Sequence, residues 1–123
     1  MKAMTPRPQA LLYTPAGQET APYTNVLEKL MRVRLLFAED MELTLSALAA
    51  GQKGSAAGEA PDEAFLVLCG CDSAFLNKVL QALRTPGVPP LPLKATLTPH
   101  NVNWTARQLF DEICRERAEM EKR

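Results

Sequence analysis

The chain has 123 residues, the length of one domain, and its 46 % hydrophobic and 23 % charged residues can build a core without disulfides or structural metals. Its formal net charge is zero, and no stretch combines clustered basic residues with aromatics, so a nucleic-acid-binding protein is excluded. No apolar run approaches the roughly 20 residues that a membrane-spanning helix needs, so a membrane protein is excluded as well.

The compartment is indicated by the cysteines and by the N-terminal residues. Prolines at positions 6, 8 and 15 interrupt any apolar segment of a signal peptide. Cys69, Cys71 and Cys114 form an odd set in a chain with an adequate core, which indicates free thiols in a reducing environment. We therefore expect a soluble, cytoplasmic protein.

The N-terminal half shows two strand-helix patterns. Residues 1–9 are rich in proline and are expected to form a flexible lead-in to a single α/β domain at residues 10–123. A first strand is expected at residues 10–13, followed by a helix with Pro22 in its first turn. The run from Val33 to Ala38 predicts a second strand, and Asp40 is the expected N-cap of a second helix that ends at Gly51.

A segment without bulky apolar residues separates the two halves. Residues 51–63 contain three glycines and predict a mobile loop. Gly54 and Gly58 lack the Gly-Lys-Ser/Thr ending of a phosphate-binding loop, so that function is excluded.

The C-terminal half repeats the pattern with clearer signals. The continuous apolar run Phe65 to Cys69 predicts a strand buried on both faces, and Asp72 or Ser73 is expected to cap the helix that follows. A fourth strand is expected from Leu93, at a sheet edge, because the prolines before it cannot donate ladder hydrogen bonds. The last helix is predicted by a capping box, Thr105 with Gln108, and by a hydrophobic staple between its flanking apolar residues, Trp104 and Leu109. The charged tail, residues 115–123, is expected to be solvated.

Alternating strands and helices predict an α/β fold with a mostly parallel four-stranded sheet flanked by helices. Right-handed crossovers favour a doubly wound arrangement in the order 2-1-3-4, with a switch point between strands one and three. A ferredoxin-like α+β fold, with two helices on one face of an antiparallel sheet, is the alternative.

The strand end Lys94-Ala95-Thr96-Leu97-Thr98, followed by Asn101 in a turn and Trp104 at the start of a helix, resembles a bacterial family, domain of unknown function 3783. The wider likeness includes the Leu11-Leu12-Tyr13 run, the Leu48 to Gly51 helix end and the Phe65 to Gly70 strand. Cys71 stands where the resemblance leads us to expect an apolar residue. The resemblance implies a bacterial protein and assigns no activity.

Polar side chains gather at the predicted strand-to-helix junction of residues 93–105. Lys94, Thr96 and Thr98 share one strand face because side chains alternate, and together with backbone donors of the turn they could hold an anion. Parallel strands end at the same sheet edge, so the end of the third strand is expected beside this turn. The candidate ligand-binding residues are Cys71, Asp72, Lys94, Thr98, His100, Asn101 and Trp104.

Two chemical hypotheses involve the Cys69-Gly70-Cys71 sequence. The two thiols with His100 could bind a metal, but a closed zinc site needs about four ligands, and Cys114 lies too far along the last helix. Alternatively, the following helix dipole could lower the pKa of Cys71 and make it a nucleophile with His100 as its base. Small core residues are the simpler explanation of both cysteines, and no metal or cofactor is assigned.

No catalytic arrangement is evident, so whether the chain is an enzyme stays open. We expect a non-catalytic binding or regulatory module, whose partner is an unknown protein or a small anionic ligand. The alternative is a small enzyme or anion-binding protein that uses Lys94 and His100 at the strand-to-helix turn. The charged last helix could also mediate a homodimer.

Overall fold

The computed structural model describes residues 8–55 and 59–121. Most of the expected lead-in, residues 1–7, therefore lies outside the described part of the chain. The N-terminal elements are β1 (Gln9–Tyr13), α1 (Ala21–Leu27), β2 (Arg32–Leu36), the short 3-10 helix η1 (Ala38–Asp40) and α2 (Leu45–Ala49). The C-terminal elements are β3 (Phe65–Cys69), α3 (Ser73–Ala82), β4 (Lys94–Thr96) and α4 (Ala106–Glu121).

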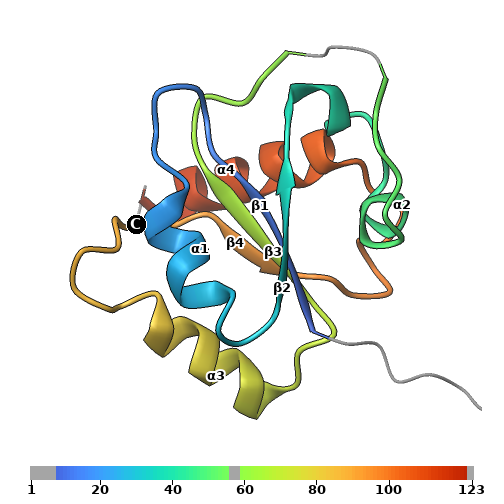
Figure 1. Ribbon diagram of the computed structural model, residues 1–123. Helices are drawn as coiled ribbons and strands as arrows, with labels where there is room; N and C mark the ends of the chain where they lie inside the picture. Colours follow the sequence, from blue (N-terminus) through green and yellow to red (C-terminus); the bar gives the residue numbers. More distant parts are fainter. Residues whose placement is uncertain (1–7, 56–58, 122–123) are drawn as a thin grey trace, which may run out of the picture.

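The four strands form one sheet in the order β2-β1-β3-β4, which confirms the predicted order and the α/β class. β1 and β2 are parallel, as are β3 and β4, but the central pair β1 and β3 is antiparallel. The switch point expected between strands one and three is therefore wrong, because the carboxyl ends of these antiparallel strands lie at opposite ends of the sheet. The long segment after β2 returns to the end of the sheet where β2 stopped, so β3 begins there and runs antiparallel to β1 (Figure 1).

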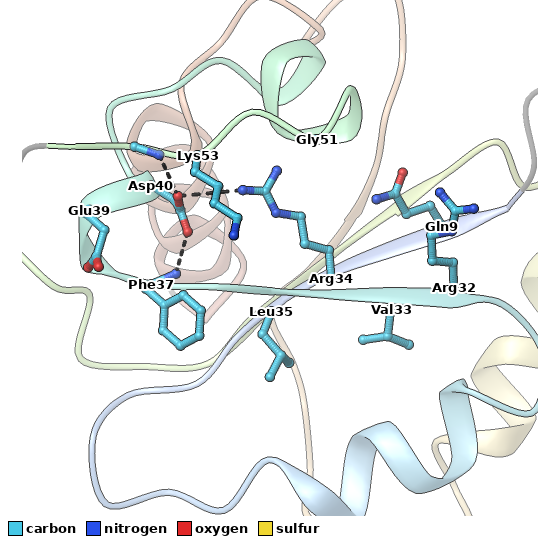
Figure 2. A pocket seen from close by; sticks show the side chains of 11 residues that line it. Gln9, Arg32, Val33, Arg34, Leu35, Phe37, Glu39, Asp40, Gly51 and Lys53 are labelled. Carbon is cyan, nitrogen blue, oxygen red and sulfur yellow. Dashed lines mark hydrogen bonds and ion pairs between the residues drawn. The ribbon is translucent and has the colours of Figure 1, made fainter.

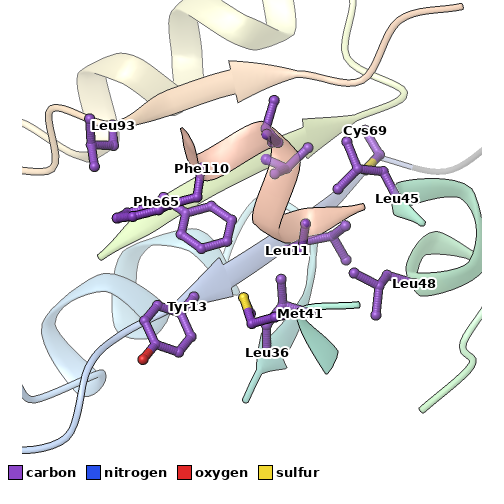
Figure 3. Packing of buried hydrophobic residues seen from close by; sticks show 13 residues of the cluster. Leu11, Tyr13, Leu36, Met41, Leu45, Leu48, Phe65, Cys69, Leu93 and Phe110 are labelled. Atoms are coloured by element: carbon purple, nitrogen blue, oxygen red, sulfur yellow. The ribbon is translucent and has the colours of Figure 1, made fainter. Parts of the chain in front are cut away.

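Helices cover both faces of the sheet, so the ferredoxin-like alternative is wrong. α1 and α3 pack on one face, over a core that includes Tyr23, Leu27 and Val79. α2 and α4 pack on the other, where Leu45, Leu48, Leu109 and Phe110 meet the sheet residues (Figure 3). β3 lies between the two cores and is buried along its whole length, as its continuous apolar sequence predicted.

The two halves of the chain repeat one arrangement. Each half runs strand, helix, parallel strand, helix, and the halves meet through the antiparallel β1–β3 pair. Thr44 and Thr105, the residues before α2 and α4, form an antiparallel bridge between the two halves. The bridging hydrogen bonds are reciprocal: the Leu45 amide donates to the Trp104 carbonyl at 2.8 Å, and the Ala106 amide donates to the Leu43 carbonyl at 3.0 Å.

The loops that lead into α2 and α4 are also equivalent. Asp40 accepts a hydrogen bond from the Phe37 amide at 2.9 Å, and Asn101 accepts one from the Thr98 amide at 2.9 Å, each across three residues. Asp40 and Asn101 are the two buried polar residues of the described chain, 3 % and 8 % exposed. The same turn chemistry therefore occurs once in each half, at opposite ends of the sheet.

Helix boundaries confirm some predictions and correct others. Asp72 caps α3 by accepting from the Phe75 amide at 2.8 Å, and Thr105 and Gln108 form the predicted capping box at 3.1 and 2.9 Å. The expected capping role of Asp40 is wrong: Thr44 caps α2 at 3.2 Å, and Asp40 instead ends η1. Most of the charged tail is exposed, and it is helical up to Glu121.

Part of the segment expected to be a mobile loop is held by the folded chain. The Tyr13 hydroxyl donates to the Pro61 carbonyl at 2.8 Å, and Arg117 binds the Glu63 carboxylate with two bonds of 2.8 and 2.9 Å. Arg107 contacts Glu59 at 3.0 Å. Residues 56–58 lie outside the described residues.

Candidate functional site

The candidate residues after β3 lie beside those after β4, because these strands are parallel. Asp72 is occupied as the N-cap of α3. The Cys71 thiol donates to the Cys69 carbonyl at 3.6 Å, and burial, with the nearby Asp72 carboxylate, raises its pKa. This shift is opposite to the one that the nucleophile hypothesis requires.

The turn between β4 and α4 uses its polar side chains to hold its own backbone. Asn101 accepts from the Thr98 amide and donates to the Thr96 carbonyl at 3.0 Å. The Thr98 hydroxyl accepts from the His100 and Asn101 amides at 3.2 and 3.3 Å. These bonds explain why this sequence forms a turn here, and they leave the Asn101 side chain engaged within it.

The remaining candidates also make contacts within the protein. The Lys94 amine donates to the Leu91 carbonyl, and burial, followed by the charge of Arg84, lowers its pKa. His100 is exposed and packs edge-on against Trp104, with ring centroids 5.4 Å apart. Among the described residues, no group of three or more His, Cys, Asp or Glu side chains could hold a metal ion.

A larger concave surface lies at the opposite edge of the sheet, along β2. We call it the β2 groove; its volume is about 700 Å³. The groove follows the outer side of the edge strand and extends to η1 and to the chain after α2 (Figure 2). It is lined by Gln9, Arg32, Val33, Arg34, Leu35, Phe37, Glu39, Asp40, Gly51, Lys53 and Gly54.

A buried ionic cluster builds one end of the groove. One carboxylate oxygen of Asp40 accepts from the Phe37 amide, and the other accepts from the Gly54 amide at 2.9 Å. Arg34 lies 3.7 Å from the same carboxylate and donates to the Leu48 carbonyl at 2.6 Å. Asp40 and Arg34 thus join the end of β2, η1, the end of α2 and the chain after α2.

Gly54 allows the chain after α2 to approach η1. A Cβ atom at this position would lie 1.6 Å from the Glu39 carbonyl oxygen, so a larger residue would force the two segments apart. This close approach places Lys53 at the groove.

The two faces of β2 differ in chemistry. Val33, Leu35 and Phe37 point to the α1 face of the sheet, whereas Arg32 and Arg34 point to the α2 face, as Figure 2 shows. Leu35 is 38 % exposed and Phe37 is 55 % exposed, which is unusual for large apolar side chains side by side on a strand edge.

The β2 groove was not among the sites predicted from the sequence. The sequence feature that could have indicated it is the alternation of Arg32 and Arg34 with Val33 and Leu35, which is typical of a strand with one polar and one apolar face. The exposure of the apolar face depends on the strand being at an edge with α1 covering only part of it. That is a property of the assembled sheet.

No helix in the described residues is long and apolar enough to cross a membrane. Searches of curated proteins and of solved structures found no match. A family model does match: residues 64–120, which comprise β3, α3, β4 and nearly all of α4, match the family described as Domain of unknown function (DUF3783). The family resemblance is thereby confirmed over residues 64–120, which match domain of unknown function 3783.

Proposed function

We propose that this chain is a non-catalytic protein-binding module of the cytoplasm, and that it binds an extended segment of its partner along the β2 edge. The observation that carries this proposal is the exposure of Leu35 and Phe37 beside a groove of about 700 Å³ on an edge strand. Among the described residues β2 pairs with β1 alone, so its outer backbone groups are available to a further strand.

The central part of this edge lacks the usual protection against strand addition. Natural edges are often blocked by a proline, a bulge or a charge that points outward across the strand. β2 contains no proline, and its central Arg34 is turned onto Asp40 and Leu48 rather than outward. β4, the other edge, has only three residues, which gives a partner fewer backbone groups to bind.

The alternative of a small enzyme or anion-binding protein has less support. It requires Lys94 and His100 to be available together, yet the Lys94 amine is bonded to the Leu91 carbonyl and His100 packs on Trp104. A concavity of about 310 Å³ contains Lys94 and Thr96, but the other side chains in it are apolar, and His100 is not among them.

The test is an NMR titration of the 15N-labelled protein with a capped, uncharged peptide of alternating threonine and valine. We expect the backbone amide resonances of residues 32–37 to shift, because main-chain hydrogen bonds supply affinity in strand addition whatever the side chains. The protein concentration is kept below any self-association seen by sedimentation. Shifts confined to β4 or to the Lys94–Trp104 segment would contradict the proposal.

A matched pair of variants controls for nonspecific apolar binding. Leu35→Lys places a charge on the exposed apolar face and should abolish the β2 shifts. Met120→Lys makes the same change at a residue that is 68 % exposed on α4, away from the groove, and should leave them unchanged. Equal loss in both variants would show that the peptide does not recognise β2.

A further inference from the structure

We infer that the partner segment at β2 alternates apolar and acidic side chains. This inference rests on the proposed function, since it assigns a chemistry to a strand added at that edge. An added strand continues the sheet, so its side chains alternate between the same two faces as those of β2. One set will therefore lie on the α1 face and the other on the α2 face.

The α1 face of the groove selects apolar side chains. Val33, Leu35 and Phe37 form a row on this face, and the last two remain partly exposed. Directly opposite side chains on adjacent strands lie about 5 Å apart, so apolar partner residues would cover this row and exclude water from it.

The α2 face of the groove selects acidic side chains. It presents Arg32, Arg34 and Lys53 against the carboxylates of Asp40 and Glu39. Both carboxylate oxygens of Asp40 bind backbone amides, and the group lies beside Arg34. Glu39 has no ion pair among the described residues, so one carboxylate remains in the groove with the two cations Arg32 and Lys53. No ion pair within 4.0 Å joins Arg32 or Lys53 to any other described residue, so these two cations face the position of an added strand without a carboxylate partner there.

A second copy of this chain fits the groove less well. Two β2 strands paired about a two-fold axis, with their apolar faces on the same side, bring Arg32 and Arg34 of both copies onto one face. Like charges on neighbouring strands of the same face repel. An acidic segment supplies the opposite charge at the same positions, so charge complementarity favours a different protein over self-association.

The test compares three capped hexapeptides that share valine at alternate positions and carry glutamate, threonine or lysine at the others. Binding is measured by the shifts of the residue 32–37 amides at about 50 mM and about 500 mM salt. We expect the glutamate peptide to bind at least about fivefold more tightly than the lysine peptide at low salt, as two partly exposed ion pairs would give. The difference should shrink at high salt.

Charge reversal identifies the groups responsible. Arg32→Glu with Lys53→Glu should remove or invert the preference for glutamate, while the threonine peptide still binds. Lys78→Glu, on the exposed side of α3, is the matched control and should keep the preference. An unchanged preference in the double variant would overturn the inference.

The outcomes separate this inference from the proposed function. Equal binding of all three peptides at β2 would keep strand addition and overturn the acidic partner. Binding of none of them by a monomeric protein would overturn both. A dimer that excludes all three peptides and is disrupted by Leu35→Lys would make a second copy the occupant, and would overturn the acidic partner while β2 remained an association surface.

Discussion

Asp40 is the residue on which the shape of the β2 groove depends. It is almost fully buried, and its two carboxylate oxygens bind the Phe37 and Gly54 amides and lie beside Arg34. Removing the carboxylate would leave two backbone donors without an acceptor and a partly buried guanidinium without its counter-ion, which is costly in a low-dielectric environment. The role of Asp40 is therefore structural: it holds in place the β2 groove, which we propose binds a partner.

Asp40→Ala should lower the free energy of unfolding by about 3 kcal/mol, because it leaves several buried groups without partners. Asp40→Asn should lower the free energy of unfolding by less, about 1–2 kcal/mol, because an amide oxygen can still accept from the Phe37 amide. Asn101 accepts from the Thr98 amide in the same way in the other half. Urea denaturation at neutral pH measures both. Equal losses in the two variants would show that the cluster depends on the negative charge rather than on the hydrogen bonds.

The two buried polar residues show the limit of local sequence patterns. Asn101 was expected in a turn, and it lies there because its side chain binds the backbone of its own loop. Asp40 was expected to cap a helix, since aspartate before an apolar run is a common start signal. Its bond to the Gly54 amide, 14 residues further along the chain, and its ion pair with Arg34 of β2 give it a different role.

At the scale of elements, β3 is the strand whose environment was most predictable. Its five apolar residues are all buried between the two helical layers. Cys69 at its end is 6 % exposed, and burial, followed by the effect of Cys71, raises the pKa of its thiol from 9.0 to about 11. This supports the interpretation of Cys69 as a small core residue.

The raised pKa predicts a loss of stability in alkaline solution. The Cys69 thiol contributes stability that is fully present below the unfolded pKa of 9.0 and is lost as the pH rises through the folded pKa of about 11. The loss should reach about 2 kcal/mol, measured as the change in unfolding free energy between neutral pH and about pH 11.

Cysteine variants identify the source of that loss. Cys69→Ala should make the alkaline dependence of the unfolding free energy shallower, although it lowers stability at neutral pH by leaving a small cavity. Cys114→Ala, at a half-buried position on α4, should retain most of the dependence. If both variants lost stability at high pH as steeply as the unmodified chain, another group would be responsible.

At the scale of the whole molecule, the match to domain of unknown function 3783 covers one of two equivalent halves. Residues 64–120 contain β3, α3, β4 and nearly all of α4, while β1, α1, β2 and α2 repeat this order on the other side of the β1–β3 pair. Neither half alone encloses both cores, because each core contains residues from both halves. The halves are therefore parts of one folding unit.

This arrangement predicts a single cooperative unfolding transition. The sole tryptophan, Trp104, lies just before α4, where its carbonyl accepts from the Leu45 amide of the other half. Its fluorescence and the far-UV circular dichroism should therefore give the same urea midpoint, as expected for a small two-state domain. Two separated transitions would show that the halves unfold independently.

The sequence by itself determined the α/β class, the strand order, the caps of α3 and α4 and the family resemblance, because hydrophobic periodicity, capping residues and turn chemistry act over a few neighbouring positions. Only the tertiary structure decided the antiparallel β1–β3 pairing, the repeat of the two halves, the role of Asp40 and the exposure of Leu35 and Phe37. Each of these depends on contacts between segments far apart in the chain, and nothing in the local pattern of either segment encodes its partner.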